Sequence, residues 1–353
     1  MEILTTRYGH IMKRILESCD YEAVQSLRKS SFNLRGFIDS FPPDPHVRSI
    51  HLQMEISTEI YMVVNFLNPE VPPLDIRYGA ERGKTVVVKN AILKTRKEKV
   101  FENENFVDMF CKDFSILQRF LSHQKAPMDE VSFKIFREDH AGTFAKIGNM
   151  LSKGKPLPTR KIALKVYRVE EIMAIFPYLA PGVLKDIYFE QARMGITRNS
   201  HQLNLTDLAK LKQWKKADTV QIKEFTVRYP SRFLHFSRVE TCFRTISMKD
   251  IESLKKAFLK DDTPKFFEIS AEAPEEHMYF EHVMRKMGGD WTEERNRDQL
   301  RRFRQVTPVQ GNNDKVATFL LFYSSLKLER NCLSEEEFDK KMYGDFLRWD
   351  RLL

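Results

Sequence analysis

The stretch "RKIALKVYRVEEIMAIFPYLAPGVLKDIYFEQ", Arg160 to Gln191, contains one strand–helix–strand period of this 353-residue chain. Its two ends alternate apolar and polar residues, as β-strands do when one face is buried. The middle, "VEEIMAIFPYL", has apolar residues at the spacing of an amphipathic helix. We therefore predict two parallel strands joined by a helix that returns across one face of their sheet.

The same alternation extends over residues 104–275. It predicts strands at "DEVSFKIF", "RKIALKVY", "LKDIYFEQ", "ADTVQIKEF", "RVETCFRTI" and "PKFFEIS", with helices between most of them. Neighbouring strands begin about 20 to 33 residues apart, the period of one strand plus one helix in a solenoid. The predicted fold class is α/β, a leucine-rich-repeat-like open solenoid with a mainly parallel sheet, although the Leu-Asn framework of that repeat is absent. A closed barrel is the alternative, which the uneven spacing disfavours.

A short helical unit precedes these repeats. Two apolar runs have helical spacing, Met12, Ile15, Leu16 and Cys19 in the first and Val24, Leu27, Leu34 and Ile38 in the second. Asp20, between the runs, suits a helix N-cap. The prolines of "SFPPDPH", Ser40 to His46, then stop any helix. Because a unit of about 40 residues cannot bury a core of its own, the rest of the chain or another protein must cover its apolar stripe.

Four β-rich runs follow the prolines, "RSIHLQMEI", "EIYMVVNF", "LDIRYG" and "KTVVVKN". Turn residues separate them, which predicts an antiparallel meander over about residues 47–91. The domains expected are therefore a helical unit at 1–41, a linker and meander at 42–103, the β/α repeats at 104–275, and a C-terminal helix and hairpin at 276–353.

The chain is basic, with a net charge of +9. Its basic runs at Lys94–Lys99 and Arg295–Arg304 could favour nucleic acid or an acidic protein, but a solvated face with helical salt bridges is the simpler interpretation. We expect an intracellular protein, cytoplasmic and/or nuclear, because no secretory leader or membrane-length apolar run is present. The scattered cysteines Cys19, Cys111, Cys242 and Cys332 lack metal or disulfide spacing and are expected to act as small buried hydrophobes.

Motifs for catalysis are absent from the sequence. "GNMLSKGK", Gly148 to Lys155, has the wrong glycine spacing for a phosphate loop. His277 and His282 are five residues apart, so they diverge by about 140° on a helix and are poorly placed to share a metal ion. No nucleophile-elbow, zinc-protease or dinucleotide motif occurs. These observations indicate a non-enzymatic binding protein without metal or cofactor.

The segment "IMKRILESCDYEAVQSLRKSSFNLRGFID" resembles an F-box, especially its nematode form. The matching residues are Ile15, Leu16, Asp20, Leu27, Arg28, Lys29, Leu34, Arg35, Phe37, Ile38 and Asp39. The chain departs from the family where F-boxes open with Leu-Pro and a nearby Glu, because Arg7, Tyr8 and His10 stand there. Cys19 also replaces a common Leu.

The downstream half resembles the FTH (FOG homology) domain that accompanies this F-box in nematode proteins. The resemblance rests on "LAPGVLKDIYFE", "LKQWKKADTVQIKEFTV", "FLHFSRVE" and "ISMKDIESLKKAFLKDDTPKFFEIS", which occur in the family's order. It implies a substrate-recognition subunit of an SCF-type ubiquitin ligase, with the F-box bound to the Skp adaptor, and through it to cullin, and the FTH domain bound to an unknown target protein. The alternative is a non-catalytic protein- or RNA-binding module whose divergent F-box no longer engages the ligase.

Two sets of site residues follow. The adaptor-binding set is Ile11, Met12, Ile15, Leu16, Cys19, Val24, Leu27 and Arg28. The target-binding set comes from strand alternation, which directs one side of each strand away from the helices; it is Lys134, Lys165, Tyr167, Tyr188, Gln221, Lys223 and Arg244. The alternatives are that the helical stripe packs on the meander, and that loops hold the target. If the stripe instead faces the adaptor, residues 42–353 should fold without it.

Overall fold

The computed structural model of the chain describes residues 9–54, 58–89, 97–136, 142–192, 201–259, 266–271, 280–295, 301–309, 312–321 and 325–331. The chain divides into two compact units. The first unit contains Met1–Asn199 and Thr206–Ala217, and the second contains Ser200–Leu205 and Asp218–Leu353. Arg7, Tyr8, His277, Cys332 and parts of both basic runs lie outside the described residues.

Three short helices open the first unit, α2 (Gly9–Ser18), α3 (Tyr21–Ser30) and α4 (Phe32–Ser40). Asp20 caps α3, as predicted, because its carboxylate accepts a hydrogen bond from the Ala23 amide. The second predicted helix is two helices: Ser31 has extended backbone angles, φ −152° and ψ 139°, and separates α3 from α4. Leu34 and Ile38 therefore lie on a different helix from Val24.

The sheet of the first unit begins as the predicted meander. Its antiparallel strands are β1 (Val47–Met54), β2 (Glu59–Phe66), β3 (Leu74–Glu81), β4 (Lys84–Lys89) and β5 (Lys97–Phe101). The parallel strands are β6 (Met128–Ile135), β7 (Thr159–Val166) and β8 (Asp186–Gln191). Because β1 also pairs in parallel with β6, the meander and the β/α repeats share one sheet.

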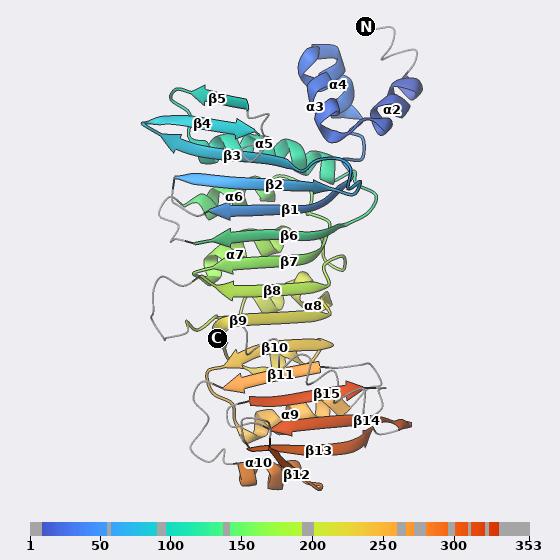
Figure 1. Cartoon of the computed structure of the whole chain (residues 1–353), viewed down its shortest axis with the longest axis vertical. Helices are drawn as coiled ribbons and strands as arrows, with labels where there is room; N and C mark the ends of the chain where they lie inside the picture. The colour runs from blue at the N-terminus through green and yellow to red at the C-terminus, as the bar shows by residue number, and fades with distance from the viewer. Residues whose placement is uncertain are drawn as a thin grey trace. The chain divides into compact units, whose positions relative to one another are not determined.

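Helices cover one face of this sheet (Figure 1). They are α5 (Phe106–Leu121), α6 (Thr143–Ser152), α7 (Val169–Ile175) and the short α8 (Lys212–Lys216), with the 3-10 turns η1 (Phe176–Tyr178) and η2 (Leu208–Lys210). The core lies between the layers, where Phe110, Phe114 and Trp214 are buried. On β7 the aliphatic residues face this core, as the alternation predicts. The helices leave the opposite side of the sheet uncovered (Figure 1).

The second unit repeats the parallel arrangement. Strands β9 (Thr219–Val227), β10 (Arg238–Phe243) and β11 (Phe266–Ala271) are parallel. Four antiparallel strands continue the sheet in the order β15 (Ser325–Asn331), β14 (Asn312–Leu321), β13 (Arg301–Val309) and β12 (Thr292–Arg295). The helical elements are η3 (Pro230–Phe233), α9 (Met248–Leu259) and α10 (Phe280–Met287). The described residues of the C-terminal segment thus form one helix and four strands rather than a helix and a hairpin.

The predicted mixed α/β class, the N-terminal helices and the parallel strand–helix alternation are confirmed. Residues Gly148–Ser152, which resemble part of a phosphate loop in sequence, belong to α6. Within the described residues, no helix is both long and apolar enough to cross a membrane.

Candidate functional site

The N-terminal helices are attached to the sheet and α5 by an aromatic contact. The ring of Tyr21 lies 5.7 Å from Phe120 of α5, edge to face, and 6.3 Å from Phe66 of β2. Burial, with a smaller contribution from the nearby Asp113 carboxylate, raises the pKa of Tyr21 well above its usual value. Tyr21 is thus a core residue shared by the helices and the sheet.

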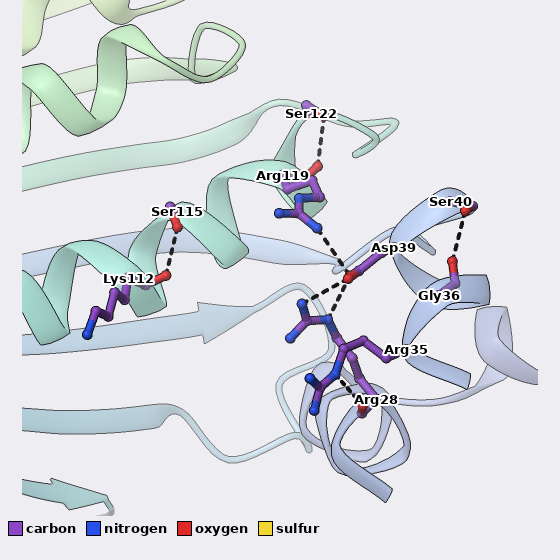
Figure 2. A network of polar contacts seen from close by, with 9 residues as sticks. All are labelled: Arg28, Arg35, Gly36, Asp39, Ser40, Lys112, Ser115, Arg119 and Ser122. Carbon is purple, nitrogen blue, oxygen red and sulfur yellow. Dashed lines mark hydrogen bonds and ion pairs between the residues drawn. The ribbon is translucent and has the colours of Figure 1, made fainter. Parts of the chain in front are cut away.

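A charged network makes a second attachment (Figure 2). Arg28 of α3 donates two hydrogen bonds to the carboxylate of Asp39 on α4, at 2.7 and 3.0 Å. Arg119 of α5 contacts the same carboxylate at 3.2 Å. The hydrogen bond from Arg28 is the main reason that the pKa of Asp39 lies below its ordinary value. One carboxylate therefore connects α3, α4 and α5.

These attachments divide the predicted adaptor-binding set. Leu16 and Val24 are only 1% and 2% exposed and pack inside the chain. Ile11 and Ile15 are 44% and 47% exposed and lie one turn apart on the outer side of α2. Met12, Cys19, Leu27 and Arg28 are half-buried.

Two exposed phenylalanines were absent from that prediction. Phe32, the first residue of α4, is 84% exposed, and Phe41 follows the end of α4. The Lys13 ammonium lies 3.9 Å from the centre of the Phe41 ring. A single helix was predicted over this segment, so the break at Ser31 was missed. Recognition of that break would have indicated that Phe32 begins a separate helix.

The predicted target-binding residues of the first unit come together on the uncovered side of the sheet. In the parallel register Lys134 of β6 pairs with Lys165 of β7, which pairs with Glu190 of β8. The Lys165 ammonium lies 2.5 Å from the Glu190 carboxylate. The Tyr188 hydroxyl donates a hydrogen bond to the same carboxylate at 2.7 Å. Lys134 is exposed. We call this group, with Tyr167 and Phe136, the open-face cluster.

Phe136 and Glu190 were not predicted as members of this cluster. The Lys165 ammonium lies 5.6 Å from the centre of the Phe136 ring, and the Tyr167 hydroxyl donates to the Phe136 carbonyl at 2.9 Å. Strand alternation places Phe136 on the same face as Lys134 and Glu190 on the same face as Tyr188, but neither residue was included in the target-binding set. The cluster thus combines lysine, glutamate and aromatic side chains on the uncovered side of the sheet, and of these types the aromatic ones are enriched in protein interfaces.

The remaining target-binding residues belong to the second unit. Gln221 donates to Glu240 at 3.1 Å on the neighbouring strand. Lys223 lies in a bulge of β9, because Gln221 pairs with Glu240 whereas Thr226 already pairs with Cys242. Arg244 lies just beyond the end of β10. The predicted single row is therefore divided between two compact units and interrupted at Lys223.

A polar chain on the uncovered face of the first unit was not anticipated. His51 contacts the Ser132 hydroxyl at 2.7 Å through Nδ1 and the Ser49 hydroxyl at 3.0 Å through Nε2, and Asn65 donates to Ser49 at 2.9 Å. Burial is the largest cause of the lowered pKa of His51. The Ser132 hydroxyl belongs to a buried residue, and a second hydroxyl rather than a carboxylate meets the other ring nitrogen. This geometry satisfies polar groups on the sheet and does not make a serine nucleophile.

Metal-ligating residues do not gather among the described residues, where no group of three or more His, Cys, Asp or Glu side chains is placed to hold an ion. The described cysteines, Cys19, Cys111 and Cys242, are free thiols and half-buried. Burial raises the pKa of Cys111 to about 11, so its thiol stays protonated near neutral pH.

Comparison with known proteins identifies one domain. Residues 142–283 match the family model of the FTH domain. This range includes all four sequence segments on which the FTH resemblance was based. No curated protein and no solved structure matches the chain significantly.

Proposed function

From the FTH domain at residues 142–283 and the F-box-like helices before it, we propose that the chain is the substrate-recognition subunit of an SCF-type ubiquitin ligase. Its N-terminal helices would bind the Skp adaptor, and the FTH-containing part would bind the target protein. The FTH match is the observation that carries the proposal, because an FTH domain accompanies an F-box in the nematode proteins that the sequence resembles. A leucine-rich-repeat-like character of the β/α region belongs to the same proposal.

Such a receptor performs no bond chemistry. It acts by holding a target near a ubiquitin-conjugating enzyme, which raises the effective concentration of the target's lysines. The attachments at Tyr21 and Asp39 support this role, because a helical unit fixed to α5 holds a bound adaptor at a defined position relative to the open-face cluster. A flexible connection would allow the bound target to sample many unproductive positions.

The exposed side of α2 is the surface that we assign to the adaptor. Ile11 and Ile15 present apolar surface to solvent, whereas Leu16 and Val24 stabilise the helical unit from inside. Apolar anchors of this kind contribute about 1.5 to 3 kcal/mol each when a partner covers them fully. The adaptor interface therefore involves the outer members of the predicted set.

The test is co-purification of the full chain with purified Skp adaptor. Ile11→Lys with Ile15→Lys places two charges on the assigned surface and should abolish the complex. His10→Lys with Glu17→Gln is the matched control, because it adds the same charge at exposed positions on another side of α2 and should retain the complex. Equal retention by both double variants would reject the assigned surface.

The buried positions of Leu16 and Val24 favour one alternative function. They are what a structural role would require, and the chain would then be a protein- or RNA-binding module whose F-box-like helices only complete the fold. Failure of the unmodified chain to bind the adaptor, with target binding preserved, would select this alternative.

A further inference from the structure

Two arginines emerge side by side at the carboxyl ends of parallel strands in the second unit. Val227 of β9 pairs with Phe243 of β10, and Arg228 and Arg244 are the next residues along each chain. Paired strands lie about 4.8 Å apart, so the backbones of the two arginines are close. Both side chains are exposed, and Arg244 donates from Nη1 to the Gln202 side chain at 3.3 Å. The two cationic groups thus leave the sheet at the same edge.

An exposed aromatic residue follows directly. Tyr229 is 56% exposed, and the Arg232 guanidinium lies 4.9 Å from the centre of its ring. Its backbone is left-handed, with φ 64° and ψ 79°, although it is not glycine and precedes Pro230. Both features disfavour that conformation, since bulky residues rarely adopt positive φ and a residue before proline prefers extended angles. Surrounding structure therefore holds Tyr229 in a strained position in which its ring faces solvent.

We propose that Arg228, Tyr229, Arg232 and Arg244 form a binding site for an acidic segment of a partner protein. Guanidinium groups bind carboxylates through paired hydrogen bonds, and an exposed tyrosine adds apolar contact at low entropic cost. Arg228 has no ion-pair partner within the described part of the chain, so its charge is available. This site extends the proposed function and rests on it in one respect, that the partner is taken to be the target protein of the ligase.

A peptide fits this cluster better than a nucleic acid strand does. Single-stranded nucleic acid binds by stacking successive bases on several aromatic rings along a basic groove. Here one tyrosine ring is available, and Arg232 lies against it. One ring does not provide the row of stacking surfaces that such a strand needs.

The proposal is tested by fluorescence anisotropy with the full chain and a fluorescein-labelled peptide of alternating Glu and Ser. Arg228→Glu with Arg244→Glu should weaken binding by at least about tenfold, because attraction becomes repulsion at two contacts. Lys256→Glu with Arg285→Glu is the matched control, since it makes the same charge change at exposed helix positions of the second unit and should leave the affinity unchanged. Tyr229→Gly should weaken binding while leaving Tm unchanged or higher, because glycine accepts positive φ.

Three results would overturn the proposal. The first is failure of the unmodified chain to bind the peptide. The second is an equal loss of peptide affinity in the two charge-reversed double variants. The third is that a labelled oligouridylate binds more tightly than the peptide and that Arg228→Glu with Arg244→Glu abolishes this binding. The last result would assign the cluster to RNA. Because the adaptor is absent from this assay, a failed adaptor co-purification leaves its outcome unaffected, and the two proposals can fail separately.

Discussion

Replacement of Tyr21 by alanine tests whether the N-terminal helices belong to the core of the first unit. Tyr21 is 8% exposed, and its ring contacts Phe66 and Phe120. Burial of such a side chain contributes about 1.5 to 3 kcal/mol, and each aromatic pair adds about 0.5 to 1.5 kcal/mol. With the cavity that alanine leaves, we expect a loss of about 3 to 5 kcal/mol in the free energy of unfolding. Tyr21→Phe keeps both ring contacts and should cost about 1 kcal/mol or less.

Urea denaturation followed by circular dichroism gives the change in stability, and hydrogen exchange locates it. Because the chain has two compact units, the unfolding curve can contain two transitions, and only that of the first unit should move. Amides of α3, α4 and α5 should exchange faster in Tyr21→Ala, whereas those of β10 and β11 should not. A change below about 1 kcal/mol, with unchanged exchange in α5, would refute the assignment of Tyr21 to the core.

Three further predictions concern the first unit. The pKa of Asp39 in the folded chain is below its ordinary value of 3.8, so its ion pairs stabilise the fold fully at pH values above 3.8. This contribution is lost as the pH falls through the lower folded pKa. Asp39→Asn should therefore flatten that part of the curve of stability against pH. Gly154→Ala would place a methyl group against the side-chain amide of Gln118, which donates hydrogen bonds to the Leu151 and Lys155 carbonyls. We expect a loss of about 1 to 3 kcal/mol in the free energy of unfolding measured by urea denaturation, and little further loss when Gln118 is already alanine. Lys134→Glu should lower the yield of partner proteins recovered by affinity purification and mass spectrometry without changing Tm. The control Lys153→Glu makes the same charge change just after α6 and should recover the partners of the unmodified chain.

The strand–helix alternation was predictable because burial on one side of a strand produces a periodic pattern of apolar residues in the sequence. Ile162, Leu164 and Val166 are apolar and buried, and Lys165 between them lies on the uncovered face. The same pattern places Lys134, Lys165 and Tyr188 on the uncovered face of the sheet. It does not show which residues of neighbouring strands share hydrogen bonds, so the contacts of Glu190 had to come from the structure.

The attachment of the N-terminal helices was only half predictable. An apolar stripe shows that a surface must be covered, but whether the chain or a partner covers it depends on contacts far apart in sequence. Including Tyr21, three residues before Val24, would have extended the stripe and indicated more buried surface than an adaptor-facing helix needs. With Tyr21 packed on Phe120, removal of residues 9–41 should expose the ring of Phe120 and destabilise the first unit, contrary to the expectation that residues 42–353 fold alone.

The segment "KEFTVRYP", Lys223 to Pro230, is where local sequence preference and structure disagree most. It contains no glycine or asparagine, yet Glu224 and Tyr229 both have a φ of 64°. Each such residue costs about 1 to 3 kcal/mol, so tertiary contacts must compensate for both. Tyr229 is exposed beside Arg228 and Arg244, and a binding role for these residues would account for the strained backbone at Tyr229.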